Sequence, residues 1–94
     1  MTFFLREIRA ASYSGTEIGF HADEAILFAA QAARGAASLT INSNMHPELE
    51  IDKVTTPNGN TISGLNEMEH QGFSSAMIRA IVKSSNKIND IVKE

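Results

Sequence analysis

Apolar residues along most of this chain recur at intervals of three and four positions, the spacing that places side chains on one face of an α-helix. In residues 2–14 the repeat is formed by Phe4, Leu5, Ile8 and Ala11. No capping box precedes this segment, so it begins as a helix cut from a longer polypeptide would, although a short natural tail explains the start equally well. Gly15 and Gly19 then predict the end of the helix and a connection to the next one.

A second helix is predicted from His21 or Ala22 to about Ile41. Eight alanines lie between residues 22 and 37, and the few large apolar side chains are Ile26, Leu27, Phe28 and Leu39. A helix that is small or apolar nearly all round is normally surrounded by other helices. We therefore expect a second copy of the chain to cover part of it. A tightly packed monomeric bundle is the alternative.

The rest of the chain predicts three further helices. Turn-prone residues 42–44 end the second helix, and a short one follows from Pro47 to about Lys53, because proline suits a first helical position. After the turn at residues 57–59, a fourth helix starts with Asn60 or Thr61 as its cap. Its apolar positions are Ile62, Leu65 and Met68.

Gly72 ends the fourth helix, and the last one is predicted to start at Ser74 or Ser75. One face of this last helix carries Met77, Ile78, Ile81, Ile88, Ile91 and Val92. The pattern as a whole predicts a single all-α domain, residues 1–94, built as a bundle of four to five helices.

Composition and charge exclude several functional classes. The net charge is −3 and the basic residues are scattered, so we expect no nucleic-acid partner. The absence of cysteine excludes a disulfide scaffold, a thiolate metal site and a cysteine nucleophile. The sequence also lacks a signal peptide and an apolar run long enough to cross a bilayer, which predicts a cytoplasmic protein with no membrane partner.

Titratable side chains offer little further chemistry. His21, His46 and His70 have no ligand-like spacing, so we interpret them as cap or surface residues and expect no metal site. The carboxylates of Glu48 and Glu50, like those of Glu67 and Glu69, are two positions apart and point away from each other on a helix. We therefore expect these side chains to be solvated and to form no acid/base pair.

The one stretch that suggests chemistry is residues 54–65, VTTPNGNTISGL, which we call the signature segment. A turn that leads into a helix start directs several backbone N–H groups, hydroxyls and the positive end of the helix dipole into one small space, which suits a carboxylate or phosphate. Two other readings stay open. Asn58-Gly59 can form the turn of a β-hairpin between residues 54–55 and 61–62, or these polar residues only make a turn and a cap.

The signature segment resembles that of the pyrroline-5-carboxylate reductases. Those enzymes carry a valine, two small hydroxyl residues, Pro, Gly, Gly, any residue, Thr, two more residues, a small residue and a leucine. His46-Pro47 before the segment, the alanine-rich helix with Gly35, and Gly72-Phe73 after the segment extend the resemblance over essentially the whole chain. It implies the all-helical C-terminal domain of these enzymes, similar to that of 6-phosphogluconate dehydrogenase, which forms an interleaved homodimer and sometimes higher oligomers.

The resemblance also implies a reaction, the NAD(P)H-dependent reduction of 1-pyrroline-5-carboxylate to L-proline in proline biosynthesis. NADPH or NADH would be held by a Rossmann domain that this chain lacks, so the chain would be an excised domain, inactive alone and binding no cofactor itself. The substrate-binding residues would be Thr56, Pro57, Asn58, Gly59, Asn60 and Thr61. Thr56 and the amides around residues 59–61 would hold the substrate carboxylate, and Thr61, the catalytic residue, would place its hydroxyl near the ring nitrogen.

Two residues depart from the family pattern. Asn58 replaces the first glycine of the pair, and Glu50 replaces an aliphatic residue whose packing Leu49 or Ile51 would have to supply. Neither change removes a residue with an implied role. A noncatalytic helical association module, whose loop only caps a helix, is the alternative function.

Overall fold

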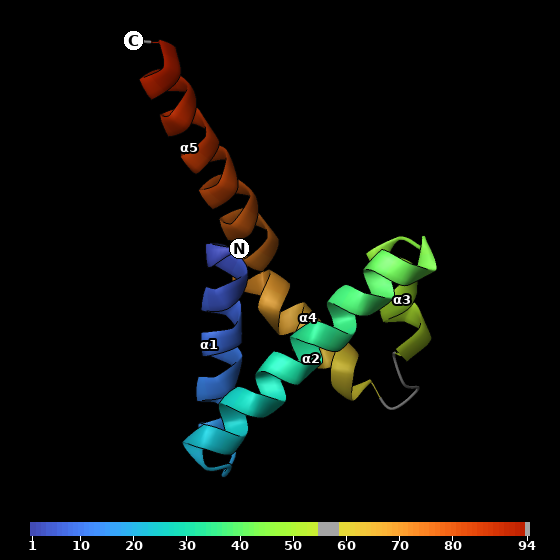
Figure 1. Ribbon diagram of the computed structural model, residues 1–94. Helices are drawn as coiled ribbons and strands as arrows, with labels where there is room; N and C mark the ends of the chain where they lie inside the picture. The colour runs from blue at the N-terminus through green and yellow to red at the C-terminus, as the bar shows by residue number, and fades with distance from the viewer. Residues whose placement is uncertain (55–58, 94) are drawn as a thin grey trace. The chain divides into compact units, whose positions relative to one another are not determined.

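The computed structural model describes residues 1–54 and 59–93, with side chains at residues 1–53 and 59–89. The described residues form five helices: α1 (Thr2–Glu17), α2 (Ala22–Ser43), α3 (Pro47–Val54), α4 (Asn60–His70) and α5 (Phe73–Lys93) (Figure 1). No strand occurs in the described residues, which confirms the all-α class. The hairpin reading is wrong, because Val54, Thr61 and Ile62 from its proposed arms all lie in helices.

The chain divides into two compact units, Met1–Val54 and Thr55–Glu94. In the first unit, α1 and α2 form a helical hairpin around a short connection. The N–H of Phe20 donates to the carbonyl of Gly15 at 3.0 Å, and the N–H of Gly19 donates to that of Thr16 at 3.1 Å. This is the Schellman pattern of a helix end, and Gly19 supplies the positive φ of 115° that it requires.

Helix α1 continues to Glu17, so the prediction that it ends before Gly15 is wrong. The reason is the packing between α1 and α2. A Cβ atom placed on Gly15 would lie 2.9 Å from the Cβ of Ala25, closer than two carbon atoms can approach. Gly15 therefore serves close contact between the two helices rather than a break in the first.

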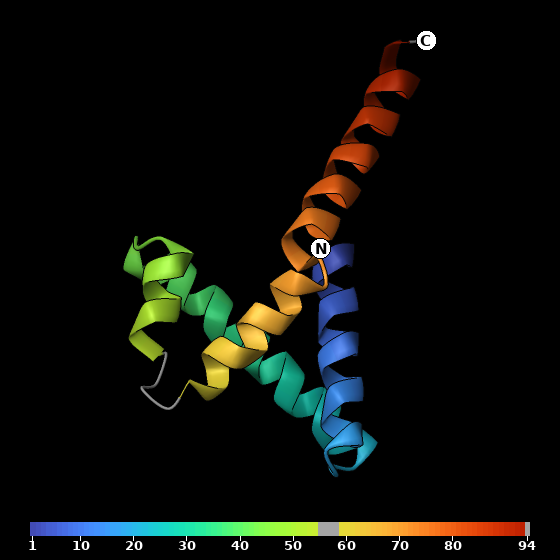
Figure 2. The ribbon, with the colours of Figure 1, turned by 180° about the vertical axis from the view of Figure 1, so that it is seen from behind.

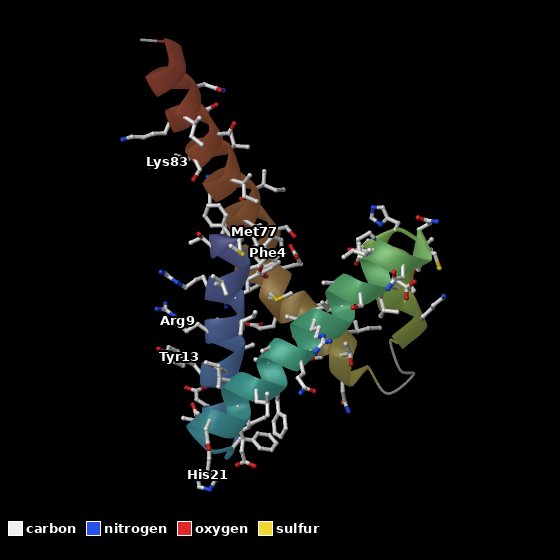
Figure 3. The ribbon with its side chains drawn as sticks, viewed as in Figure 1. Phe4, Arg9, Tyr13, His21, Met77 and Lys83 are labelled. Atoms are coloured by element: carbon white, nitrogen blue, oxygen red, sulfur yellow. The ribbon has the colours of Figure 1, made fainter. Side chains whose placement is uncertain are left out.

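Small residues line this contact. Ser12 and Ala25 are the buried residues of α1 and α2, 5% and 4% exposed, and the Ser12 hydroxyl donates to the carbonyl of Arg9 at 2.7 Å. On the outer side of α1 the Arg9 guanidinium lies 5.6 Å from the centroid of the Tyr13 ring (Figure 3). In the described part of the chain, Ala25 is the only buried apolar residue, so one copy of the chain has a thin core.

Large apolar side chains on α2 remain about half exposed in the single chain. They are Ile26, Leu27, Phe28 and Leu39. Phe28 contacts Phe20 edge to face, with ring centroids 5.4 Å apart. Phe28, Gly35 and Leu39 share one face of the helix at spacings of seven and four residues, and we call this face the Gly35 stripe.

The second unit consists of α4 and α5, which are joined through Gly72 (Figure 2). Gly72 has a φ of 89°, and its N–H donates to the carbonyl of Glu69 at 2.9 Å. The Ser74 hydroxyl donates to the carboxylate of Glu69 at 2.6 Å, so the link between the helices is hydrogen-bonded on both sides of the glycine. The carbonyl of Gly72 accepts from the N–H of Ala76 at 2.9 Å, and α5 begins at Phe73, one residue earlier than predicted.

Helix α5 also carries an uncovered apolar face. Its large, exposed apolar side chains among the described residues are Ile78, Ile81, Val82 and Ile88. Lys83 extends away from the helix axis (Figure 3). Among the helices that the structure describes, none is both long enough and apolar enough to cross a lipid bilayer.

Candidate functional site

The described half of the signature segment is the beginning of α4. Gly59 occupies the N-cap position with φ 78° and ψ 4°, a left-handed conformation that glycine adopts at low cost. The first hydrogen bond of the helix runs from the N–H of Ser63 to the carbonyl of Gly59, at 2.8 Å. The three N–H groups before it, on Asn60, Thr61 and Ile62, therefore have no partner within the helix.

The prediction that Asn60 or Thr61 caps this helix is wrong. Both residues are the first two of α4, and among the described residues no side chain makes a cap hydrogen bond at its start. The cause is the left-handed Gly59, which begins the helix one residue earlier. The change leaves backbone N–H groups directed out of the helix end with both side chains exposed beside them.

Such a helix start can bind an anion. A left-handed residue followed by right-handed ones directs successive N–H groups into one concave nest, and the helix dipole adds positive potential. The first turn of α4 contains no acidic residue that would compete for the N–H groups. Gly59, Asn60 and Thr61 lie at this helix start, and their binding roles stay predictions. Thr56, Pro57 and Asn58 lie outside the described residues.

The three histidines occupy helix ends. His21 is the N-cap of α2 and His70 is the last residue of α4. The Nδ1 atom of His46 accepts a hydrogen bond from the N–H of Glu48 at 3.1 Å, which makes it a side-chain cap for α3. In residues 1–54 and 59–93, no group of three potential metal-ligating side chains comes together.

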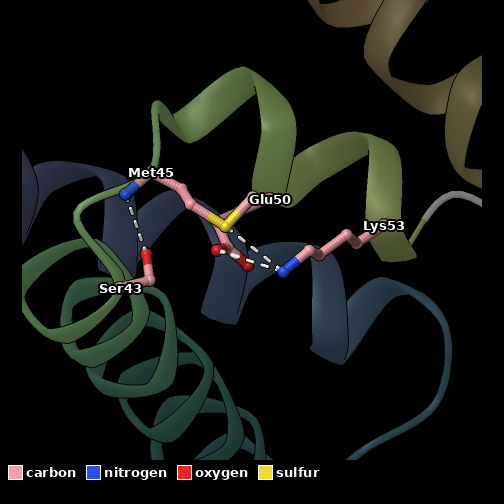
Figure 4. Close-up of polar contacts among 4 residues, drawn as sticks. All are labelled: Ser43, Met45, Glu50 and Lys53. Atoms are coloured by element: carbon pink, nitrogen blue, oxygen red, sulfur yellow. Dashed lines mark hydrogen bonds and ion pairs between the residues drawn. The ribbon is translucent and has the colours of Figure 1, made fainter.

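A polar cluster that the sequence did not suggest joins α3 to the end of α2 (Figure 4). The Lys53 ammonium donates to the sulfur of Met45 at 3.3 Å and lies 3.9 Å from Oε1 of Glu50. The N–H of Met45 donates to the hydroxyl of Ser43 at 3.2 Å. We call Ser43, Met45, Glu50 and Lys53 the α3 clamp. The one signal available in the sequence was the spacing of three between Glu50 and Lys53, which places opposite charges on one helix face.

Glu50 is not solvated as expected. Its side chain is 12% exposed, and its Oε1 atom is buried without a hydrogen-bond partner among the described groups. Glu48, two positions earlier, is exposed. The prediction that the two carboxylates point apart is therefore consistent with the structure, but one of them points into the first unit, where Ile51 is also partly buried and Leu49 is half exposed.

Comparison with known protein families gives a match that covers nearly the whole chain, including the signature segment. A family model described as pyrroline-5-carboxylate reductase dimerisation matches residues 1–91. The chain belongs to this family. The assignment confirms the resemblance that residues 54–65 suggested, and the roles of individual residues in that segment stay predictions.

Curated relatives in this family are much longer than the chain. Pyrroline-5-carboxylate reductase 1 of Dictyostelium discoideum is 66% identical over 87 residues, which are 93% of this chain and 16% of that protein. Pyrroline-5-carboxylate reductase 2 of the same organism is 58% identical over 85 residues, 90% of this chain and 28% of that protein. The reductase of Neurospora crassa is 40% identical over 79 residues, 84% of this chain and 24% of that protein. The chain spans less than a third of the length of each.

Proposed function

We propose that this chain provides the association interface and the substrate-carboxylate site of an NAD(P)H-dependent pyrroline-5-carboxylate reductase, which reduces 1-pyrroline-5-carboxylate to L-proline. The observation that carries the proposal is the uncapped start of α4. Three N–H groups without helical partners follow the left-handed Gly59 there, at the position of the family signature. A carboxylate fits this nest because it accepts several hydrogen bonds and bears a full negative charge.

In this proposal the chain orients the substrate. The amides of Asn60 and Thr61 hold the carboxylate, and the Thr61 hydroxyl lies beside the ring nitrogen, where it steadies the proton of the iminium. Thr56 would add a second hydroxyl, and Pro57 and Asn58 complete the proposed set of substrate-binding residues. A nicotinamide cofactor, held outside this chain, supplies the hydride. Fixing the ring relative to the hydride donor lowers the barrier by converting a bimolecular encounter into an oriented one.

The same proposal includes a homodimer, and higher oligomers built from it. Its support is the amount of apolar surface that one chain leaves uncovered on α2 and α5. Half-exposed Phe, Leu and Ile side chains each gain on the order of 1 kcal/mol when a partner covers them. Several such residues on each chain are sufficient to drive association, and interleaving the helices of two chains would cover α2 from more than one side.

A titration with L-proline tests the carboxylate site. Backbone amide signals of Gly59, Asn60 and Thr61 are followed by NMR as L-proline is added to this chain. We expect shifts confined to these residues, reduced in Thr61→Ala and retained in Ser63→Ala, a hydroxyl control on the same helix. Shifts spread evenly over the chain, or equal in the two variants, would contradict the assigned site.

Activity is tested in a chimera that contains a cofactor domain. The matching segment of the 66% identical Dictyostelium relative is replaced by residues 1–91 of this chain. We expect turnover of 1-pyrroline-5-carboxylate in the chimera and a loss of about 10²-fold in its Thr61→Ala variant, typical for a group that stabilises a transition state. Undiminished turnover in that variant would show that Thr61 has no catalytic role.

The alternative is a noncatalytic association module. The exposed apolar faces of α2 and α5 support association in either case, so the solution mass does not separate the two functions. The chimera does. A chimera that forms a stable dimer and binds nicotinamide cofactor, yet neither turns over the substrate nor responds to L-proline at residues 59–61, would favour the association module.

A further inference from the structure

His46 caps α3 through a ring atom that can take up a proton. Its Nδ1 atom lies 3.1 Å from the backbone nitrogen of Glu48. A backbone N–H can only donate, so Nδ1 is the acceptor, and the proton of the neutral ring is on Nε2. An imidazolium ring carries hydrogen on both nitrogens and has no acceptor to offer here. The cap therefore requires the neutral form of His46.

The other two histidines do not share this contact. His21 is the N-cap residue of α2, yet among the described residues no side chain makes a cap hydrogen bond at that helix start. His70 lies in the last turn of α4, where the helix dipole favours a positive charge. Among the three histidines, protonation thus removes a helix cap at His46 alone.

Helix α3 depends strongly on its cap because it is short. It has eight residues, whereas isolated helices shorter than about 12–15 residues are marginal in water. Pro47 has no N–H, and the N–H groups of Leu49 and Glu50 reach the His46 carbonyl at 2.9 and 3.3 Å. The Glu48 N–H is therefore the one donor of the first turn that relies on a side chain.

Charges around the ring do not replace the lost acceptor. Helix α2, which packs against α3, has no charged residue after Arg34. In the described part of the chain, no ion pair joins the His46 ring to a charged side chain of α3, and the Glu50 carboxylate is paired with Lys53 instead. The carboxylates of α3 attract a protonated ring, whereas the positive end of the helix dipole repels it. The charged side chains of α3 are Glu48, Glu50, Asp52 and Lys53.

We propose that His46 is a pH-sensitive cap that loosens α3 on acidification. When a proton from solvent binds Nδ1, the hydrogen bond from the Glu48 N–H is lost, and a positive charge stands at the positive end of the helix dipole. The stabilisation is present above the range in which histidine titrates, about pH 5 to 8, and is lost as the pH falls through it. The response lies within the unit Met1–Val54 and does not depend on the proposed reductase function.

Hydrogen exchange measured by NMR tests the opening of α3. The amides of Asp52 and Lys53 are followed, because residues this far into a helix donate to carbonyls four positions back. Each rate is expressed as a protection factor, relative to an unstructured peptide at the same pH, so that the pH dependence of exchange itself cancels. We expect both protection factors to fall about fivefold between about pH 8 and 5.5, the scale of a lost cap. The ring ¹⁵N signals of His46 show over the same range when Nδ1 takes up its proton.

Three variants separate the cap from other effects of pH. His46→Asn supplies an acceptor that does not titrate, so its protection should stay high at every pH. His46→Ala has no side-chain cap and should be as weakly protected at pH 8 as the wild type is in acid. His21→Asn, the matched control, should keep the wild-type response. Constant protection in the wild type would overturn the proposal, as would a ring that takes up no proton in this range or a His46→Asn variant that loosens equally.

Discussion

Replacing Gly15 by alanine measures how closely α1 and α2 must approach. The new Cβ would lie 2.9 Å from the Cβ of Ala25 and 3.6 Å from its Cα. Carbon atoms in good contact are about 3.5–4.0 Å apart, so the first distance is short by more than half an ångström. Both Cβ atoms are attached directly to helical backbone, and no side-chain rotation can separate them. The helices themselves have to move apart.

Two opposing effects set the size of the change. Alanine favours a helix interior over glycine by about 1 kcal/mol, and the gain is smaller here because Gly15 is near the end of α1. Overpacking a close contact costs about 1–3 kcal/mol. The steric effect is the larger, so we expect the free energy of unfolding to fall by about 1 kcal/mol, roughly a fivefold change in the folding equilibrium constant.

Urea denaturation followed by circular dichroism, at one fixed protein concentration, gives this value. Two controls isolate the contact. Gly15→Ala combined with Ala25→Gly moves the methyl group from α2 to α1, and should recover stability relative to Gly15→Ala if the contact is the cause. Gly64→Ala, with no atom within 4 Å of its new Cβ, should gain up to about 1 kcal/mol. A Gly15→Ala variant at least as stable as the wild type would refute the close approach of α1 and α2.

Three other substitutions have separate expected outcomes. Gly35→Ala adds a methyl group that meets no described atom within 4 Å outside the neighbouring backbone of its own helix, so the fold is retained. If a second copy packs on the Gly35 stripe, the dimer dissociation constant measured by ultracentrifugation rises about fivefold or more. An unchanged constant would mean that the interface lies elsewhere. Glu50→Leu raises the free energy of unfolding in urea by about 1–2 kcal/mol, and a decrease would mean that its buried oxygen has a partner. His46→Ala speeds hydrogen exchange at the Glu48 amide about fivefold because the side-chain cap is lost. His46→Asn keeps a capping side chain, so its exchange rate stays close to that of the wild type. An exchange rate in His46→Ala equal to the wild-type rate would show that His46 does not cap α3.

Helical spacing and turn residues predicted most of the fold because those signals are local. Pro47 at a first helical position and the turn-prone Asn44, which adopts a φ of 58°, fixed the bounds of α2 and α3 to within about two residues. The predicted end of α1 at Gly15 was wrong because the role of this glycine depends on a contact with another helix. A glycine in the sequence indicates a helix end, and only the tertiary contact with Ala25, ten positions away, shows that it permits close packing instead.

The candidate site was predicted in part. The order of residues predicted a helix start at residues 59–61, which is where α4 begins. Anion binding there stays a proposal. Its cap was not predictable from the preference of Asn and Thr for that role, because Gly59 adopts a left-handed conformation that those side chains do not signal. The burial of Glu50 was not predictable either. Spacing separates Glu48 from Glu50 on a helix but does not say which of the two faces the rest of the unit.

The uncapped start of α4 has a cost in stability. A side-chain cap would stabilise α4 by about 1 kcal/mol, but it would occupy the N–H groups that the proposed carboxylate would need. Helix α3, in contrast, has a side-chain cap at its start, because the His46 ring accepts from the N–H of Glu48. On the proposed function, α4 gives up this kind of stabilisation because a cap and a bound carboxylate would compete for the same N–H groups.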